Sequence, residues 1–180
     1  MSETLYYTKF LELKSTKAKD GKDWFYAHRP NAKDVVVILP VIDDEVLFLI
    51  EERPPMQAEN RGKYTIGLAA GLVGDERLGE SVEEAIKAEL LEETGLVAEK
   101  IEIKTRNTAS SAGCVSETFT VAIAYIKDKN ENCSPIDDGG VIVDRVWIHK
   151  SQIKDWLQER EKEGCVLTAQ TLSALFYLFI

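Results

Sequence analysis

The sequence predicts an α+β fold in which a mixed β-sheet lies between helices, an α/β/α sandwich. Three observations lead to this prediction. Short apolar segments rich in β-branched residues recur along most of the chain, one helix with clear ends interrupts them, and two further helices follow near the C-terminal end. Strands interleaved with few helices favour a sheet with one helix on one side and the C-terminal helices on the other. At 180 residues the chain is long enough to bury such a core.

The first 33 residues predict a β-hairpin. Residues Phe10–Ser15 alternate as a strand does, Asp20-Gly21 is a turn, and Trp24–His28 reads as the returning strand. An isolated hairpin is only marginally stable, so this one must pack on the main domain or on a second copy of the chain. We therefore expect residues 1–33 to form an N-terminal extension and residues 34–180 to form the main domain.

The main domain begins with a second hairpin. Residues Val35–Ile42 are almost all apolar and mostly β-branched, which is typical of a strand buried on both faces. Asp43-Asp44 is a tight turn into Val46–Glu52, and two prolines then end that strand. Further strands are expected at Tyr64–Leu68, Ile101–Thr105, Phe119–Ile126 and Val141–Ile148, with long loops at Asn107–Thr118 and Asn130–Gly140.

The helix in the middle of the chain has the clearest ends. Ser81 followed three residues later by Glu84 is a capping box, in which each side chain satisfies a free backbone N–H of the other. Gly95 is a natural stop, because the residue after the last turn often needs a positive φ. Between these ends Val82, Ile86 and Leu90 recur at helical spacing and are expected to face a core.

Two helices are expected after the last strand. Ser151 is expected to cap the first, and Gly164 to end it; its apolar residues are Ile153, Trp156 and Leu157. Thr168 is expected to open the second, whose apolar stripe consists of Leu172, Leu175, Phe176 and Phe179.

Three carboxylates lie together near the end of the middle helix. Glu89, Glu92 and Glu93 stand at i, i+3 and i+4, which places them on one side. Like charges at this spacing destabilise a helix by about 0.2–0.5 kcal/mol per pair, and the C-terminal end of the helix dipole also disfavours anions. One interpretation is a solvated acidic face softened by Lys87; the other is a site for a hard divalent cation, which prefers carboxylate and carbonyl oxygens.

The net charge and the amino-acid composition exclude several classes of partner. The formal net charge is −9, so neither a nucleic-acid polymer nor an anionic membrane is an expected partner, whereas a small anion needs metal ions and local Arg or Lys. Three cysteines without metal-ligand spacing suit a reducing cytoplasm. The N-terminal residues do not resemble a signal peptide, and the apolar C-terminal segment TLSALFYLFI is too short to span a bilayer.

The middle helix and the loop before it resemble the signature of the Nudix hydrolases, hereafter the box, G-x5-E-x7-R-E-U-x-E-E-x-G-U, where U is aliphatic. Here Glu80 is followed after seven residues by Ala88-Glu89-Leu90-Leu91-Glu92-Glu93-Thr94-Gly95-Leu96. Ala88 replaces the arginine that in the family helps to hold a catalytic glutamate. Gly74 has the spacing of the opening glycine, but the Ala70-Gly71-Leu72 context favours Gly71 as its counterpart, with three residues inserted.

Other segments resemble the ADP-ribose pyrophosphatase branch of that family: Glu52-Arg53-Pro54-Pro55, Ile66–Leu72, Ser111–Glu117 and Thr168–Leu175. The resemblance implies the Nudix fold and hydrolysis of a diphosphate linkage, with ADP-ribose giving AMP and ribose 5-phosphate as the favoured reaction. It also implies a homodimer that exchanges its N-terminal hairpins, with an aromatic residue stacked on adenine. Trp24 matches that aromatic position best; the alternative is a tryptophan that fills a core or a subunit interface.

The resemblance also assigns site residues. It implies Mg²⁺ or Mn²⁺ as cofactor, and as ligands it implies the carboxylates of Glu80, Glu89, Glu92 and Glu93 and the backbone carbonyl of Ala70. Glu92 is also a catalytic candidate, sharing the inner or the outer ligand sphere. The expected substrate-binding residues are Trp24, Arg53 and Gly113; Arg53 has the fork that suits a phosphate, but a surface ion pair beside Glu51 and Glu52 is its alternative role.

The general base is left open. Many relatives place a glutamate in the loop ahead of the last strand, but the matching loop here, residues 135–141, has only Asp137 and Asp138. Asp137 or Asp138 from this loop and Glu117 from the other loop are the candidates, and the base could also be missing; Gly67 likewise stands where many relatives have a glutamate. These losses motivate a second hypothesis, a module that binds ADP-ribose or a related nucleotide without efficient turnover. A third is an unrelated α+β domain with a solvated acidic helix.

Overall fold

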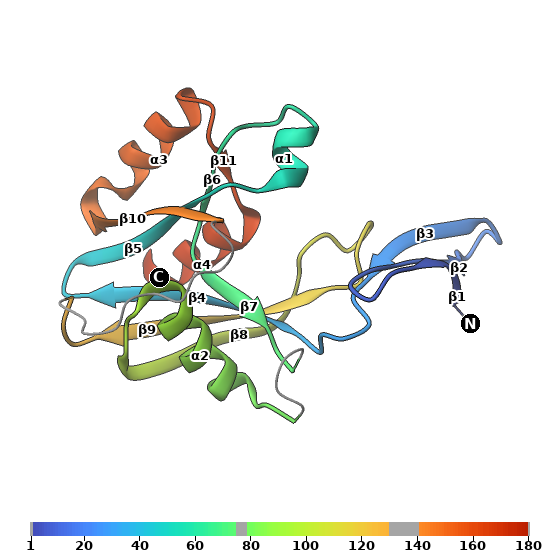
Figure 1. Cartoon of the computed structure of the whole chain (residues 1–180), viewed down its shortest axis with the longest axis horizontal. Coiled ribbons are helices and arrows are strands. Elements are labelled where there is room, and N and C mark those ends of the chain that lie inside the picture. The colour runs from blue at the N-terminus through green and yellow to red at the C-terminus, as the bar shows by residue number, and fades with distance from the viewer. Residues whose placement is uncertain (1, 75–78, 130–140, 180) are drawn as a thin grey trace.

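The computed structural model describes residues 2–74, 79–129 and 141–179. Within these residues eight strands form one mixed sheet, with the path β11-β6-β5-β4-β9-β8, while β10 pairs with β5 and β7 pairs with β4 (Figure 1). The strands are β4 (Val35–Ile42), β5 (Glu45–Glu51), β6 (Thr65–Gly67), β7 (Ala69–Leu72), β8 (Ala98–Ala109), β9 (Thr118–Ile126), β10 (Ile142–His149) and β11 (Val166–Leu167).

The central strand β4 is buried on both faces, as its β-branched run predicts. It pairs in parallel with β9 and antiparallel with β5 and β7. Because successive side chains point to opposite faces, one set packs into a core with α2 (Val82–Thr94), and the other into a core with α3 (Ile153–Lys162) and α4 (Ala169–Phe179). The first core includes Val36, Ile38, Ile86 and Leu90; the second includes Val37, Leu39, Ile153 and Leu175. This is the predicted α/β/α sandwich.

Helix α2 begins and ends where the sequence predicts. The Ser81 Oγ accepts from the Glu84 N–H at 3.2 Å, and the Ser81 N–H donates to a Glu84 carboxylate oxygen at 2.9 Å, which completes the capping box. Gly95 follows the last turn with φ +74°, and its N–H donates to the Leu91 carbonyl. Two local signals therefore fix the register of the helix that carries the box glutamates.

The N-terminal hairpin exists but belongs to a larger unit. It consists of β2 (Glu12–Lys17) and β3 (Asp23–His28), and an unpredicted strand β1 (Glu3–Tyr7) pairs antiparallel with β2. In Figure 1 this three-stranded sheet projects away from the body of the molecule. Every residue of β1 is exposed, so no in–out pattern in the sequence marks it as a strand. The division of the chain into an N-terminal extension (residues 1–33) and a main domain (residues 34–180) stays a prediction.

Several elements differ from expectation, among them strands β7 and β11, which the sequence did not predict. The proline pair after β5 opens a short helix, α1 (Pro54–Ala58), since proline is well suited to the first turn. β8 extends to Ala109 and takes in the start of the expected loop. Ser151 is not the cap of α3: it lies in a 3₁₀ turn, Lys150–Gln152, which is capped by the His149 ring.

Helix α4 starts where the sequence predicts, but its buried face differs from the predicted apolar stripe. Thr168 caps α4, because its hydroxyl accepts from the Thr171 N–H at 3.2 Å. In the stripe, Leu175 is buried, whereas Leu172, Phe176 and Phe179 are exposed. No helix within the described residues is long and apolar enough to cross a membrane.

Candidate functional site

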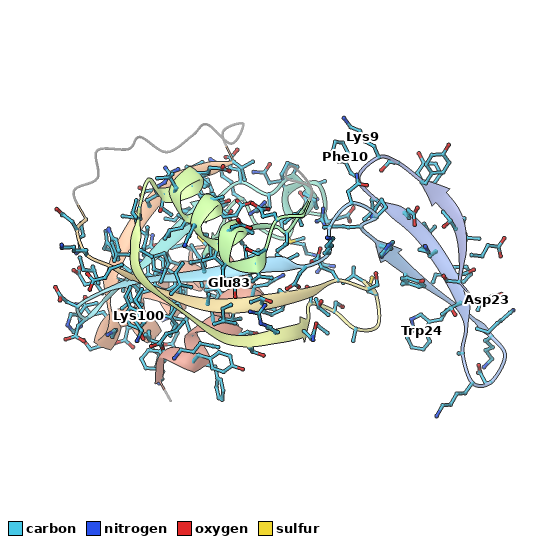
Figure 2. All side chains as sticks on the ribbon, turned by 90° about the horizontal axis from the view of Figure 1, so that it is seen from below. Lys9, Phe10, Asp23, Trp24, Glu83 and Lys100 are labelled. Atoms are coloured by element: carbon cyan, nitrogen blue, oxygen red, sulfur yellow. The ribbon has the colours of Figure 1, made fainter. Side chains whose placement is uncertain are left out.

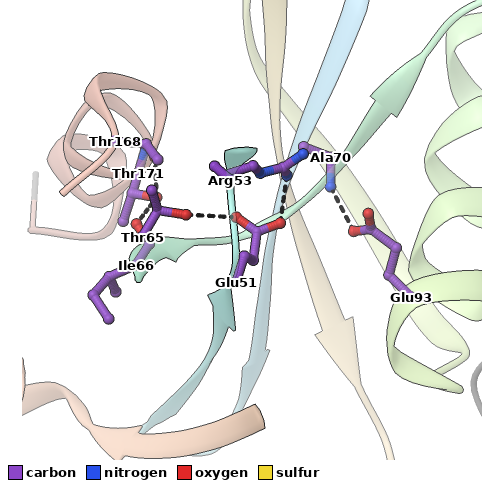
Figure 3. Close-up of polar contacts among 8 residues, drawn as sticks. All are labelled: Glu51, Arg53, Thr65, Ile66, Ala70, Glu93, Thr168 and Thr171. Atoms are coloured by element: carbon purple, nitrogen blue, oxygen red, sulfur yellow. Dashed lines mark hydrogen bonds and ion pairs between the residues drawn. The ribbon is translucent and has the colours of Figure 1, made fainter. Parts of the chain in front are cut away.

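The C-terminal half of α2 presents two carboxylates to strand β7. The Glu93 Oε2 accepts a hydrogen bond from the Ala70 backbone N–H at 2.9 Å (Figure 3). The Glu89 carboxyl group lies so close to Gly71 that a Cβ at that position would overlap it. Residue 71 must therefore be glycine if the Glu89 carboxylate is to reach the β7 backbone.

Glu93 has an unusual electrostatic environment. Its pKa is raised from 4.5 to about 8, chiefly because the carboxyl group is withdrawn from water. The negative charges of Glu89 and Glu51 raise this pKa further, while the Ala70 N–H and the positive charge of Arg53 lower it. The charges of two carboxylates and one guanidinium thus act on the Glu93 carboxyl group where α2 meets the sheet.

Glu51 is a site residue that was not predicted from the sequence, where it was expected only as a neighbour of Arg53 in a surface ion pair. It is the last residue of β5 and is only 2% exposed. Its carboxylate forms an ion pair with Arg53 and accepts from the Thr65 hydroxyl at 3.3 Å (Figure 3). A glutamate ending a strand that is otherwise buried was the available signal, because a buried carboxylate requires partners.

The remaining box positions are also in place around α2. A Glu80 carboxylate oxygen accepts from the Gly74 N–H at 3.4 Å, and Glu92 is half-buried one turn from Glu89. Arg145 on β10 donates from Nε to the Glu93 backbone carbonyl at 2.6 Å. A cation at this end of a helix interacts favourably with the exposed carbonyls, so Arg145 fastens α2 to the sheet.

The residues present fit a divalent cation. Oxygen ligands are offered by Glu89 and Glu93 from the helix, at the point where it touches the backbone of Ala70 and Gly71. In the part of the chain that the structure describes, no three His, Cys, Asp or Glu side chains already surround one common point. Glu93 is instead directed to the Ala70 N–H, so a cation would compete with that hydrogen bond.

Two predicted substrate-binding residues lie in contact with each other. The Trp24 indole on β3 donates from Nε1 to the Gly113 carbonyl at 2.9 Å, although the residue is 51% exposed (Figure 2). The N-terminal sheet also pairs with this loop through its backbone, since the Ala27 N–H donates to the Cys114 carbonyl. The loop at residues 110–117 therefore joins the N-terminal sheet to the main body.

Glu117 is held by that same junction. One oxygen accepts from Arg29 Nε at 2.7 Å and the other from the Ser110 hydroxyl at 3.2 Å. Beside it lies a small cavity of about 100 Å³ lined mainly by polar residues, among them His28, Lys33 and Ser116. The contacts of Glu117 thus run to the N-terminal sheet, whereas those of Glu93 run to β7. Asp137 and Asp138 lie outside the described residues.

Comparison with known proteins bears on the family and on the fold of the chain. Residues 32–165 match the NUDIX domain family. A solved structure described as "Crystal structure of ADP compounds hydrolase" superimposes with a TM-score of 0.74 and 21% sequence identity, covering 99% of this chain and 89% of that one. At this identity the similarity shows the fold. No curated protein matches the sequence.

Proposed function

The chain belongs to the Nudix family, and on that premise we propose that it hydrolyses a diphosphate linkage in a nucleoside diphosphate derivative, in a reaction that depends on Mg²⁺ or Mn²⁺. ADP-ribose, giving AMP and ribose 5-phosphate, is the substrate we favour. The family assignment makes the chain a Nudix pyrophosphohydrolase. The fold that it shares with an ADP compounds hydrolase supports the choice of an ADP derivative.

One observation carries the metal part of the proposal: Glu89 and Glu93 of the box helix are seated against β7 at Gly71 and Ala70. When bound there, a divalent ion neutralises phosphate oxygens and lowers the pKa of a water ligand. We assign the ion to Glu89, Glu93 and the Ala70 carbonyl, with Glu80 and Glu92 in supporting positions. Burial is the chief cause of the raised pKa of Glu93, and the charges of Glu89 and Glu51 raise it further; a bound cation would offset this repulsion.

The substrate is assigned to the two sides of this site. Arg53 contacts the diphosphate, because its exposed fork can make paired hydrogen bonds with phosphate oxygens. Trp24 and Gly113 contact the nucleoside, where the exposed indole offers a stacking surface. For the attacking water we favour Asp138 over Glu117, since both carboxylate oxygens of Glu117 are engaged. A larger loss of kcat in Asp138→Asn than in Glu117→Gln is the expected result.

Two carboxamide variants of the helix test the function. Glu89→Gln and Glu93→Gln should each lower turnover by well over tenfold while the protein stays folded, whereas Glu83→Gln should not. Glu83 is the matched control because it lies on α2 and is exposed, paired only with Arg106 among the contacts described. The assay is phosphate release coupled to a phosphatase, with ADP-ribose, NADH, sugar nucleotides and nucleoside triphosphates. If none of these substrates is turned over in a metal-dependent reaction, the proposal that the protein is an enzyme is refuted.

We also propose that the protein is a cytoplasmic homodimer formed through the N-terminal sheet. Eight of its large apolar side chains are exposed: Leu5, Tyr6, Tyr7, Phe10, Leu11, Leu13, Trp24 and Phe25 (Figure 2 labels two of them). So much exposed apolar surface on one small sheet is typical of a protein interface. Light scattering should give a dimer for the wild type and a monomer for Phe10→Ser/Phe25→Ser; a monomeric wild type at micromolar concentration contradicts this part.

The second candidate function is nucleotide binding without efficient turnover. It is favoured by Ala88, which stands where the family has an arginine, and by the absence of a glutamate from residues 135–141. Calorimetry would distinguish the two functions: micromolar binding of ADP-ribose in the presence of Mg²⁺, with no hydrolysis over hours, supports the binding module.

A further inference from the structure

We propose that Glu51 is a positioning residue that holds the Arg53 guanidinium toward the substrate's phosphates, and that Gly67 provides the space for its carboxylate. The inference rests on the proposed function, in which Arg53 binds the diphosphate. It adds two residues, Glu51 and Gly67, that the box does not contain.

The ion pair between Glu51 and Arg53 is asymmetric. The Glu51 side chain is 3% exposed, whereas that of Arg53 is 45% exposed. A fixed, buried carboxylate therefore orients a flexible side chain that reaches the surface. A guanidinium has five N–H donors, and Arg53 uses Nη2 for Glu51, so donors remain for a phosphate.

Glu51 is itself fixed from the opposite side. Its partner across the sheet is Thr65 on β6, whose hydroxyl donates to the carboxylate at 3.3 Å. The next residue, Ile66, accepts at its carbonyl from the Thr171 hydroxyl of α4 at 3.3 Å. Figure 3 shows this series of contacts running from α4 through β6 to Glu51 and Arg53. The anchor of the guanidinium is thus the sheet and a C-terminal helix.

Gly67 makes this position of the carboxylate possible. A Cβ on residue 67 would lie 2.5 Å from Glu51 Oε2 and 3.2 Å from its Cδ, and the three nearest atoms it would meet all belong to that carboxyl group. The end of a glutamate side chain can move aside more easily than backbone. Gly67→Ala should therefore displace the Glu51 carboxylate while leaving every charge in the protein unchanged.

Charge and positioning predict opposite results for Glu51→Gln. The negative charge of Glu51 repels a diphosphate, so if charge alone mattered, its removal would strengthen substrate binding. If Glu51 instead holds Arg53, its removal leaves a mobile guanidinium that must be ordered in each binding event, and binding weakens. The sign of the change thus separates the two explanations.

The test is a double-mutant cycle with ADP-ribose at saturating Mg²⁺. Glu51→Gln and Gly67→Ala should each lower kcat/KM by about tenfold, mainly through KM. In an Arg53→Ala background neither should lower kcat/KM further, because the residue through which they act is absent. Glu52→Gln is the control: it removes the same charge one residue away and should change kcat/KM by less than about twofold.

Several results would overturn the inference. These are an unchanged or higher kcat/KM in Glu51→Gln, an unchanged value in Gly67→Ala, or equal losses with and without Arg53, which would indicate a merely structural role. If Glu51→Gln does not fold, as judged by circular dichroism, Gly67→Ala decides. If the wild type hydrolyses no diphosphate, the proposed function fails separately, and the same variants are then titrated with ADP-ribose by calorimetry. Equal dissociation constants for wild type and both variants, or no binding at all, would then refute the role of Glu51.

Discussion

Glu93→Gln should stabilise the metal-free protein at alkaline pH while it abolishes most of the activity. In the folded protein the pKa of Glu93 is about 8, against 4.5 for an unperturbed glutamate. Between these values the unfolded chain releases the proton and the folded chain keeps it, so the folded state binds more protons and loses stability as pH rises. Below pH 4.5 both states are protonated, and above about pH 8 the loss is complete.

The size of the effect follows from the two pKa values. At about 1.4 kcal/mol for each pH unit, the difference between 4.5 and about 8 corresponds to at most about 5 kcal/mol at pH 9. A glutamine has no proton to lose, and its amide oxygen can still accept the Ala70 N–H that now binds Glu93 Oε2. The variant should therefore gain up to a few kcal/mol over the wild type between pH 5 and pH 9.

Urea unfolding in the presence of EDTA at pH 5, 6.5, 8 and 9 measures this difference directly. The free energy of unfolding of Glu93→Gln minus that of the wild type should increase with pH from 5 to 8 and level off between pH 8 and pH 9. For Glu83→Gln the same difference should not change, because that exposed side chain lies away from the cluster. Adding Mg²⁺ at pH 8 should raise the stability of the wild type and not that of Glu93→Gln. A difference that stays constant from pH 5 to 9 would show that the Glu93 carboxyl is not perturbed, and the reasoning from burial would be wrong.

Three further variants test the framework of the site. Gly71→Ala should weaken Mn²⁺ binding by at least tenfold, measured by calorimetry, because the new methyl group occupies the space of the Glu89 carboxylate; unchanged affinity would place the ion elsewhere. Arg145→Gln should lower kcat with little change in Mn²⁺ affinity, since it loosens α2 at the Glu93 carbonyl; normal turnover would contradict that role. Ser81→Ala should lower the free energy of unfolding by about 1 kcal/mol in urea titrations, and a neutral result would show that the capping box contributes little.

Local signals were sufficient for the parts of the fold that the sequence predicted correctly. Both ends of α2 depend on groups within four residues, so Ser81, Glu84 and Gly95 could be interpreted without knowledge of the rest of the molecule. The two-sided burial of β4 is likewise recorded in its own composition. These two elements are the ones that bring the box glutamates to the sheet.

Features that depend on distant neighbours were not predictable in the same way. The importance of Glu51 arises only when β5 pairs with β6 and brings Thr65 and Gly67 next to it. Strand β1 has no buried face, so it follows no alternating pattern. Ser151 has the side chain of a cap, yet the His149 ring two residues earlier accepts its N–H and caps the 3₁₀ turn that precedes α3. For Glu51, a contact outside the local segment therefore decides the role of the residue.

The structure also bears on the missing box arginine. In the family that arginine, replaced here by Ala88, helps to hold a catalytic glutamate. In this chain Glu93 is held at two points: its carboxylate accepts from the Ala70 N–H of β7, and its carbonyl accepts from Arg145 of β10. The charge of Arg53 acts on the same carboxyl group, because it lowers the pKa that burial raises. The Ala70 N–H of β7 and Arg145 of β10 thus restrain the end of α2, so the loss of one guanidinium at position 88 does not by itself argue for a site that only binds. The choice between catalysis and binding then depends on the residue that serves the attacking water.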